Sequence, residues 1–151
     1  VSLAAIVTLA SGGILLTVLG FQYLGGYQPC ELCHWQRYPY IATLLLGILA
    51  VAVPGWRRAI LVLCGLLFVV EAGIAAFHVG VEQHWWQGLA ACGSTFGPAE
   101  SIDELRARLL AQPVVRCDEV AWSLFGLSMA GYNFFVALAL AAFALHAARH
   151  R

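Results

Sequence analysis

Long apolar runs alternate with polar segments along this chain, and the runs have the length of membrane-spanning helices. A helix that crosses the ~30 Å hydrocarbon core of a bilayer needs roughly 20 predominantly apolar residues. The pattern predicts four such helices, at residues 3–23, 36–53, 59–79 and 124–145, with polar segments at 24–35 and 80–123. We therefore expect one all-α membrane domain over residues 1–151, built as a four-transmembrane-helix bundle. The first run is long enough to span, so we expect a retained helix there and not a cleaved signal.

Composition and charge agree with a membrane protein and exclude one class of partner. Of the residues, 62% are hydrophobic and 11% are charged, and the mean hydropathy is +0.82. Soluble domains carry about 25% charged residues. The chain has no lysine and a formal net charge of zero. Nucleic-acid binding is therefore disfavoured, because no basic surface is available to neutralise phosphates.

The positions of the arginines predict which loops face the cytoplasm. Arg57 and Arg58 follow Pro54-Gly55-Trp56, in the short turn between the second and third predicted spans, and Arg149 and Arg151 follow the fourth. Basic residues concentrate on the cytoplasmic side of membrane proteins. Both termini and this turn are therefore expected in the cytoplasm. Both cysteine-bearing segments then lie outside, in a compartment where disulfides persist.

The first polar segment holds a Cys-x-x-Cys pair, Cys30 and Cys33. Such pairs serve redox chemistry or metal binding more often than packing. Pro39 belongs in the first turn of a helix or before it, which predicts a helix start near Trp35. Cys33 would then lie at the helix N-terminus, where a thiolate is favoured, and Arg37 at i+4 would share its face. This arrangement favours electron transfer at the membrane edge.

The second cysteine pair, Cys92 and Cys117, lies near the two ends of the long polar segment. A flexible, exposed loop pair suits contact with a soluble protein, and two pairs on one membrane face can pass electrons by thiol–disulfide exchange. The chain has no haem-attachment, dinucleotide or iron–sulfur motif. We therefore expect an acceptor that dissolves in the membrane, with quinone as the natural candidate. The alternative is two disulfides that only stabilise the outer loops.

The long polar segment also contains a helix-start signal. Ser101-Ile102-Asp103-Glu104 is a capping-box pattern, and Pro113 ends the helix that it opens. The apolar side chains of this segment fall on one side of that helix. We expect a short amphipathic helix that lies on the membrane surface, or alternatively one that packs on the loop as a soluble cap.

Three further residues in the third predicted span carry chemistry. Cys64 is expected to be a buried free thiol that behaves as a small apolar residue. Glu71 lies at mid-span, where a carboxyl is costly; it either makes a polar contact that holds the bundle or handles protons. His78 lies near the outer end of the span, at the membrane face predicted for Cys33 and Arg37, which favours a functional role.

These motifs together resemble the DsbB family (disulfide bond formation protein B). The resemblance rests on Pro29-Cys30-x-x-Cys33-x-x-Gln36-Arg37, on the later Cys92 and Cys117, and on the block CDEVAWSLFGLSM at residues 117–129. It covers essentially the whole chain. It implies a multi-pass protein of the bacterial inner membrane, with its cysteine loops and active site in the periplasm. It also implies a protein-disulfide:quinone oxidoreductase that reoxidises a periplasmic DsbA-like thiol oxidase of thioredoxin fold and delivers the electrons to ubiquinone or menaquinone.

The resemblance also implies roles for individual residues. Cys92 would be attacked by the partner's thiolate, and the released Cys117 would then attack Cys30 and form a transient bridge between the loops. Cys33 would donate to the quinone. The implied catalytic residues are thus Cys30, Cys33, Cys92 and Cys117, the implied quinone-binding residues are Arg37 and His78, and no metal ligand is implied.

Two other classes of function remain open from the sequence. Cys30, Cys33 and His34 could serve as soft ligands of a metal-binding or metal-transporting membrane protein. The chain could also be a structural subunit stapled by two disulfides. A further redox class, the vitamin K epoxide reductase-like proteins, usually carries its Cys-x-x-Cys in a late helix. The sequence leaves open the type of quinone, the preferred partner, the resting disulfides and the roles of Glu71 and Cys64.

Overall fold

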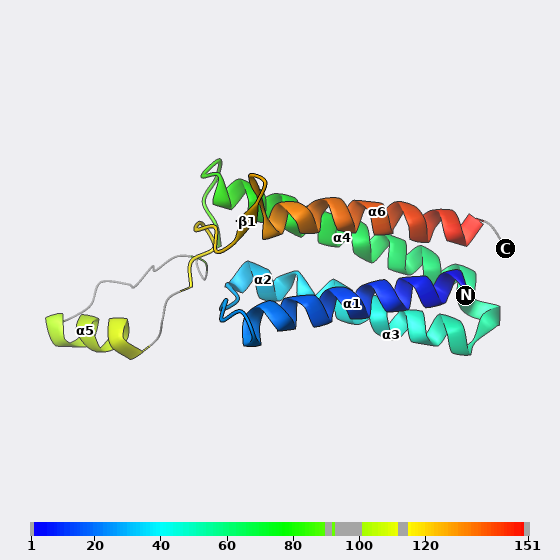
Figure 1. Ribbon diagram of the computed structural model, residues 1–151, viewed down its shortest axis with the longest axis horizontal. Helices are drawn as coiled ribbons and strands as arrows, with labels where there is room; N and C mark the ends of the chain where they lie inside the picture. Colours follow the sequence, from blue (N-terminus) through cyan, green and yellow to red (C-terminus); the bar gives the residue numbers. More distant parts are fainter. Residues whose placement is uncertain (1, 90–91, 93–100, 112–114, 150–151) are drawn as a thin grey trace.

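The structure is a computed structural model that describes residues 2–89, 92, 101–111 and 115–149, and this part of the chain is mostly helical. In Figure 1, α1 runs beside α3, and α4 runs beside α6. The described ends of α1 and α6 nearest the termini lie at one end of the bundle, and α2 lies at the other. The elements are α1 (Leu3–Tyr23), α2 (Glu31–Trp35), α3 (Arg37–Ala52), the 3₁₀ turn η1 (Pro54–Trp56), α4 (Arg57–Glu82), α5 (Ile102–Ala111), β1 (Ser123–Leu124), β2 (Leu127–Ser128) and α6 (Met129–Arg149).

Within the described residues, three helices are long and apolar enough to cross a membrane: α1, α4 with η1, and α6. The helix α1 covers the predicted range 3–23. The helix α3 has 16 residues and is about 24 Å long, which is short for a bilayer core. Gln36, between α2 and α3, has helical dihedral angles (φ −65°, ψ −19°), so α2 continues the helical path of α3. The predicted count of four spans requires α3, the second predicted span, to reach spanning length through this extension.

The fourth predicted span begins later than the sequence indicates. Residues 124–128 were expected to be its first turn, but Ser123–Leu124 and Leu127–Ser128 pair as antiparallel strands and α6 begins at Met129. The turn residues Phe125 and Gly126 have φ values of 52° and 78°, as in the tight turns that favour hairpins. A hydropathy pattern cannot detect this turn, because its residues are as apolar as those of a span. The third predicted span, 59–79, extends at both ends to Arg57–Glu82.

Small side chains let the four long helices approach closely in the core. Gly47 of α3 faces Thr8 of α1, and Gly65 of α4 faces Leu145 of α6, so closely that a β-carbon at either glycine would clash with its neighbour. Close approach over small residues is the usual packing mode between helices in membranes. Cys64 belongs to this core; it is free and fully buried, as predicted.

Glu71 connects three helices in the middle of the bundle. Its side chain is fully buried, and one carboxyl oxygen accepts a hydrogen bond from Asn133 of α6 at 2.5 Å. Asn133 in turn accepts a hydrogen bond from the Tyr40 hydroxyl of α3 at 2.6 Å. A polar contact of this kind stabilises a membrane bundle because the alternative is an unpaired polar group in hydrocarbon. The structure therefore contains the bundle-holding contact that is one of the two roles open for Glu71.

The helix α5 begins where the capping pattern predicts. Ser101 Oγ accepts a hydrogen bond from the Glu104 backbone N–H at 3.2 Å, and both Ile102 and Leu110 are exposed. Pro113 and the side chains of Leu105 and Leu109 lie outside the described residues. The location of α5 on a membrane surface stays a prediction.

Candidate redox site

The short helix α2 positions the Cys-x-x-Cys pair. Cys30 is its N-cap, and the Cys30 sulfur accepts a hydrogen bond from the Cys33 backbone N–H at 3.3 Å. The predicted helix start near Trp35 corresponds to α3, which begins at Arg37 with Pro39 in its first turn. Cys33 does not lie at the N-terminus of that helix, because the cysteine cap begins a separate helix, α2, at Glu31. Cys33 still lies in the first turn of α2. The two sulfurs are 2.8 Å apart, with Cys30 buried and Cys33 partly exposed.

The loop cysteines Cys92 and Cys117 form a disulfide. Their α-carbons are 5.0 Å apart, within the usual range for a disulfide. The expectation that this pair is exposed is wrong: Cys92 is 3% and Cys117 0% exposed. The reason is that the bridge packs on the apolar end of the bundle, together with Leu32 and Val81.

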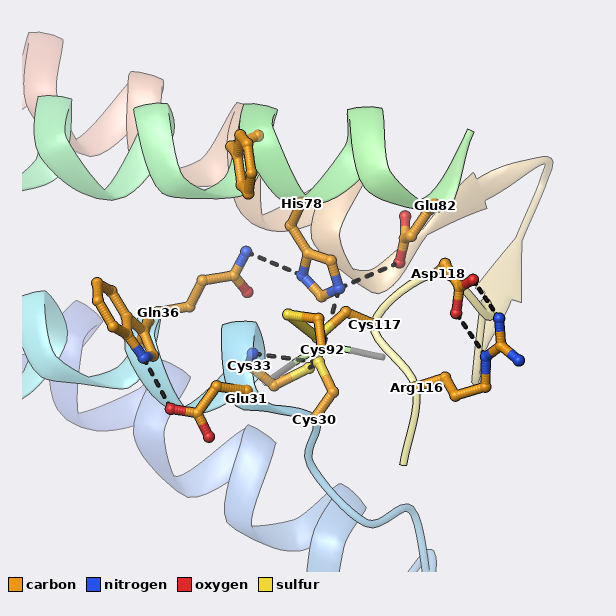
Figure 2. Close-up of a disulfide and its surroundings, with 12 residues drawn as sticks. Cys30, Glu31, Cys33, Gln36, His78, Glu82, Cys92, Arg116, Cys117 and Asp118 are labelled. Atoms are coloured by element: carbon orange, nitrogen blue, oxygen red, sulfur yellow. Dashed lines mark hydrogen bonds and ion pairs between the residues drawn. A yellow bond between two sulfur atoms is a disulfide. The ribbon is translucent and has the colours of Figure 1, made fainter. Parts of the chain in front are cut away.

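All four predicted catalytic cysteines meet in this one cluster. Cys30, Cys92 and Cys117 are buried members of it, and Cys33 packs against them. In Figure 2 the loop disulfide lies between His78 and Glu82 of α4 on one side and the Cys-x-x-Cys turn on the other. Disulfide exchange requires a thiolate to reach a disulfide sulfur. The fold therefore packs the loop disulfide and the Cys-x-x-Cys pair in one cluster, an arrangement that such an exchange needs.

His78 lies at the centre of this cluster. Its Nε2 is 3.7 Å from the Cys30 sulfur and 3.9 Å from a carboxyl oxygen of Glu82. Its Nδ1 is 3.4 Å from the Gln36 amide nitrogen. The backbone of Cys117 lies close enough to act on the ring. His78 thus lies beside both cysteine pairs, and the sulfur that it contacts is that of Cys30.

Arg37 is held toward α1 by a residue that the sequence analysis did not single out. Its Nη1 donates to the Gln22 side-chain oxygen at 2.8 Å. Gln22 precedes Arg37 by 15 positions, so no local spacing predicts the contact. Of the partners of His78, Glu82 is at i+4, so helical spacing could have identified it. Gln36 precedes His78 by 42 positions, so no local spacing predicts that contact.

The two thiols of the Cys-x-x-Cys pair differ in acidity. The hydrogen bond from the Cys30 thiol holds the pKa of Cys33 below its ordinary value, and the Arg37 charge acts in the same direction against the opposing effect of burial. The same hydrogen bond, with burial, raises the pKa of Cys30. The backbone N–H of Cys33 favours a Cys30 thiolate, but it is the weaker influence. Cys33 is therefore the more acidic and the more accessible sulfur.

A cavity of about 120 Å³ opens beside the pair. Its apolar wall comes partly from α1, through residues such as Leu15 and Val18, and partly from the end of the second cysteine loop and the start of α6, through Trp122 and Met129. Its polar wall includes Cys33 and Arg37. Outside the second cysteine loop, the polar side chains of the wall include Gln28, Cys30, Cys33, Gln36, Arg37, Tyr40, His78, Glu82 and Asn133. An apolar slot with a few polar groups at one side suits a flat ring that carries hydrogen-bond acceptors.

Charged residues of the second cysteine loop border the same cavity. Arg116 and Glu119 line it, and Arg116 forms a two-pronged ion pair with Asp118, with N–O distances of 2.8 and 2.6 Å. This ion pair holds the pKa of Asp118 below its ordinary value. Ser128 of β2 donates a hydrogen bond to Glu82, which fixes the hairpin to the end of α4. Residues 115–122 of this loop therefore border the site at this end of the bundle.

Comparison with known proteins connects this geometry to a family. The family model described as "Disulfide bond formation protein DsbB" matches residues 2–147, nearly the whole chain. The chain belongs to the DsbB family. Disulfide bond formation protein B from Polaromonas sp. (strain JS666) is 34% identical over 90% of this chain and 84% of the relative. The protein of the same name from Xanthomonas campestris is 32% identical over 95% of this chain and 87% of the relative.

A third DsbB relative, disulfide bond formation protein B 2 from Pseudomonas aeruginosa, is 33% identical over 82% of this chain and 77% of its own length. No solved structure matches the chain significantly. Membership of the DsbB family, together with the apolar helices, identifies a bacterial inner-membrane protein of disulfide bond formation.

Proposed function

We propose that this chain reoxidises a periplasmic DsbA-like thiol oxidase and passes the electrons to membrane quinone. The observation that carries the proposal is the shared buried cluster, in which the Cys92–Cys117 disulfide packs against Cys30 and Cys33. DsbB-family membership supports the same function. In this proposal the cysteine end of the bundle faces the periplasm, and the two termini and η1 face the cytoplasm.

The first half of the reaction transfers electrons from the partner to the loop pair. A partner thiolate attacks the Cys92 sulfur, breaks the Cys92–Cys117 bond and releases Cys117 as a thiolate. Cys117 then attacks Cys30 of an oxidised Cys30–Cys33 pair and expels Cys33. The second partner thiol attacks the mixed disulfide at the partner's own sulfur, so the partner leaves oxidised and Cys92 is a thiol.

The second half restores both disulfides of the chain. Cys92 attacks Cys117, which re-forms the loop disulfide and releases Cys30 as a thiol. Reoxidation of the Cys30–Cys33 pair then completes the cycle. Its lowered pKa and its partial exposure favour Cys33 as the sulfur that faces the electron acceptor.

The cavity residues fit a quinone. When bound, a quinone supplies an acceptor for the two electrons and two protons of a dithiol. The apolar wall from α1 would hold the ring, and Arg37 would hydrogen-bond a ring oxygen. His78 would contribute a polar group on the α4 side of the cavity.

A reconstituted assay tests the proposed function. The purified full chain is mixed with a reduced DsbA-like oxidase and either ubiquinone or menaquinone, and partner thiols and quinone are measured together. One quinone consumed per partner disulfide formed is the expected result. A purely structural subunit would leave both concentrations unchanged, and that outcome would overturn the proposal.

Replacing Arg37 with alanine should weaken quinone use more than partner oxidation. The loss of a charge-assisted hydrogen bond corresponds to a rise of roughly tenfold to a hundredfold in the apparent KM for quinone. The KM for the reduced partner should change little, because the loop pair does not contact Arg37. Steady-state kinetics with each substrate varied in turn measure both effects.

Arg58→Ala is the matched control for Arg37→Ala, since Arg58 is an exposed arginine at the other end of the bundle. It should leave both KM values unchanged. An apparent quinone KM in Arg37→Ala equal to that of the unmodified chain would count against a quinone-binding role for Arg37.

A further inference from the structure

Cys30, Cys33 and His78 form a compact set of soft metal-type donors. Their ligand atoms all lie within 4.8 Å of one another, and the Cys30 sulfur is 3.7 Å from His78 Nε2. Two thiolates and an imidazole are a ligand set that zinc takes in proteins. We propose that the reduced Cys-x-x-Cys pair, with His78, forms a Zn²⁺-binding site that competes with turnover.

The distances suit a cation that arrives after the pair is reduced. In a tetrahedral zinc site, two sulfur ligands lie about 3.8 Å apart and a sulfur and a nitrogen about 3.5 Å apart. The distance from Cys30 to His78 already fits. The 2.8 Å between the sulfurs must open by about 1 Å to bind zinc, and must close by about 0.8 Å to form a disulfide. Zinc binding and disulfide formation by Cys30 and Cys33 therefore exclude each other.

Neighbouring side chains complete the site. His78 Nε2 can bind a cation when Nδ1 carries the proton, and the Gln36 amide lies 3.4 Å from Nδ1. Rotation of this amide by half a turn puts its oxygen against the Nδ1 proton, the supporting contact that metal-bound histidines usually have. A carboxyl oxygen of Glu82 lies 3.9 Å from Nε2, so Glu82 or water can supply the fourth ligand. His34 is exposed and is not in this donor set.

Zinc would act as an inhibitor and not as a resident cofactor. Its binding displaces a proton from each thiol and occupies both sulfurs, so neither thiol can be reoxidised. The inhibitory consequence rests on the proposed function, whereas the binding itself does not.

Metal binding is measured first, without partner or quinone. The full chain with Cys92→Ser and Cys117→Ser, which removes the loop thiols, is reduced and titrated with Zn²⁺ against a chromophoric chelator. We expect one Zn²⁺ per chain, lost when the Cys30–Cys33 pair is oxidised and recovered on reduction. This control compares the oxidised and reduced forms of one variant, so a folding defect caused by a further substitution cannot account for the loss of zinc binding. Binding that survives oxidation, or no binding at all, would overturn the site.

Single variants on that background identify the ligands. His78→Asn should abolish stoichiometric binding, Gln36→Leu should weaken it by about tenfold, and Cys64→Ala should leave it unchanged. Equal binding in His78→Asn and the parent would exclude His78. Turnover of the unmodified chain is measured separately, with and without Zn²⁺. Absence of turnover without zinc refutes the proposed function alone, and turnover insensitive to saturating zinc refutes inhibition alone.

Discussion

Replacing Cys33 with serine should reduce partner-driven quinone reduction by at least about a hundredfold, as expected when a reacting nucleophile is removed. Cys33 is the more acidic and the more accessible sulfur of its pair, and a hydroxyl cannot take its place in disulfide exchange. Quinone consumption with the reduced partner in excess measures the effect. Cys64→Ala, which removes a free thiol from the other core cluster, should retain full turnover.

A comparison with Cys30→Ser distinguishes the two sulfurs. Both variants lose turnover because neither can form the Cys30–Cys33 disulfide. Bound quinone should, however, slow alkylation of Cys33 in Cys30→Ser and leave alkylation of Cys30 in Cys33→Ser unchanged. Unimpaired turnover of Cys33→Ser would refute its assignment as the quinone-facing sulfur, and protection of Cys30 alone would reverse the assignment.

Replacing Cys92 with serine should stop oxidation of the protein partner and leave the quinone half-reaction intact. Without Cys92 there is no loop disulfide for a partner thiolate to attack, so partner oxidation should fall by about a hundredfold or more. A small dithiol needs no loop disulfide: it can reduce the bond that Cys30 makes with Cys33 or with Cys117, and Cys33 is partly exposed. Quinone consumption should therefore continue with a small dithiol as the donor.

In Cys92→Ser, the protein partner and the small dithiol serve as each other's control as electron donors. Loss of quinone reduction with both donors would mean that the loop disulfide is needed to build the quinone site. Retention with both donors would mean that the protein partner bypasses the loop pair. Either result would contradict separate roles for the two cysteine pairs.

The elements that could be predicted from the sequence are those that depend on residues close together in the chain. The apolar run of α1 and the capping pattern before α5 both led to helices at the expected positions. Cys64 was correctly expected to be buried and free. These features depend on hydropathy, length or the spacing of a few neighbouring residues, which a single sequence contains in full.

The errors arose where a distant contact or a special backbone conformation decides the structure. The positive φ angles of Phe125 and Gly126 build a hairpin from residues that look like a span. Cys30 begins α2 by accepting a backbone hydrogen bond, which hydropathy does not predict. The burial of the Cys92–Cys117 disulfide depends on packing against α2 and α4. Polar character alone suggested an exposed loop.

The proposed function depends on thiol–disulfide exchange between the loop pair and the Cys-x-x-Cys pair. The most direct test is to locate the disulfide in Cys92→Ser after quinone oxidation, by mass spectrometry of peptides cleaved without reduction. Cys117 then has the Cys30–Cys33 disulfide within its own cluster to attack, and Cys33 is the better leaving thiolate because its pKa is lowered. The predicted product is a Cys30–Cys117 bridge with Cys33 free. A free Cys117 beside an intact Cys30–Cys33 disulfide would contradict the exchange.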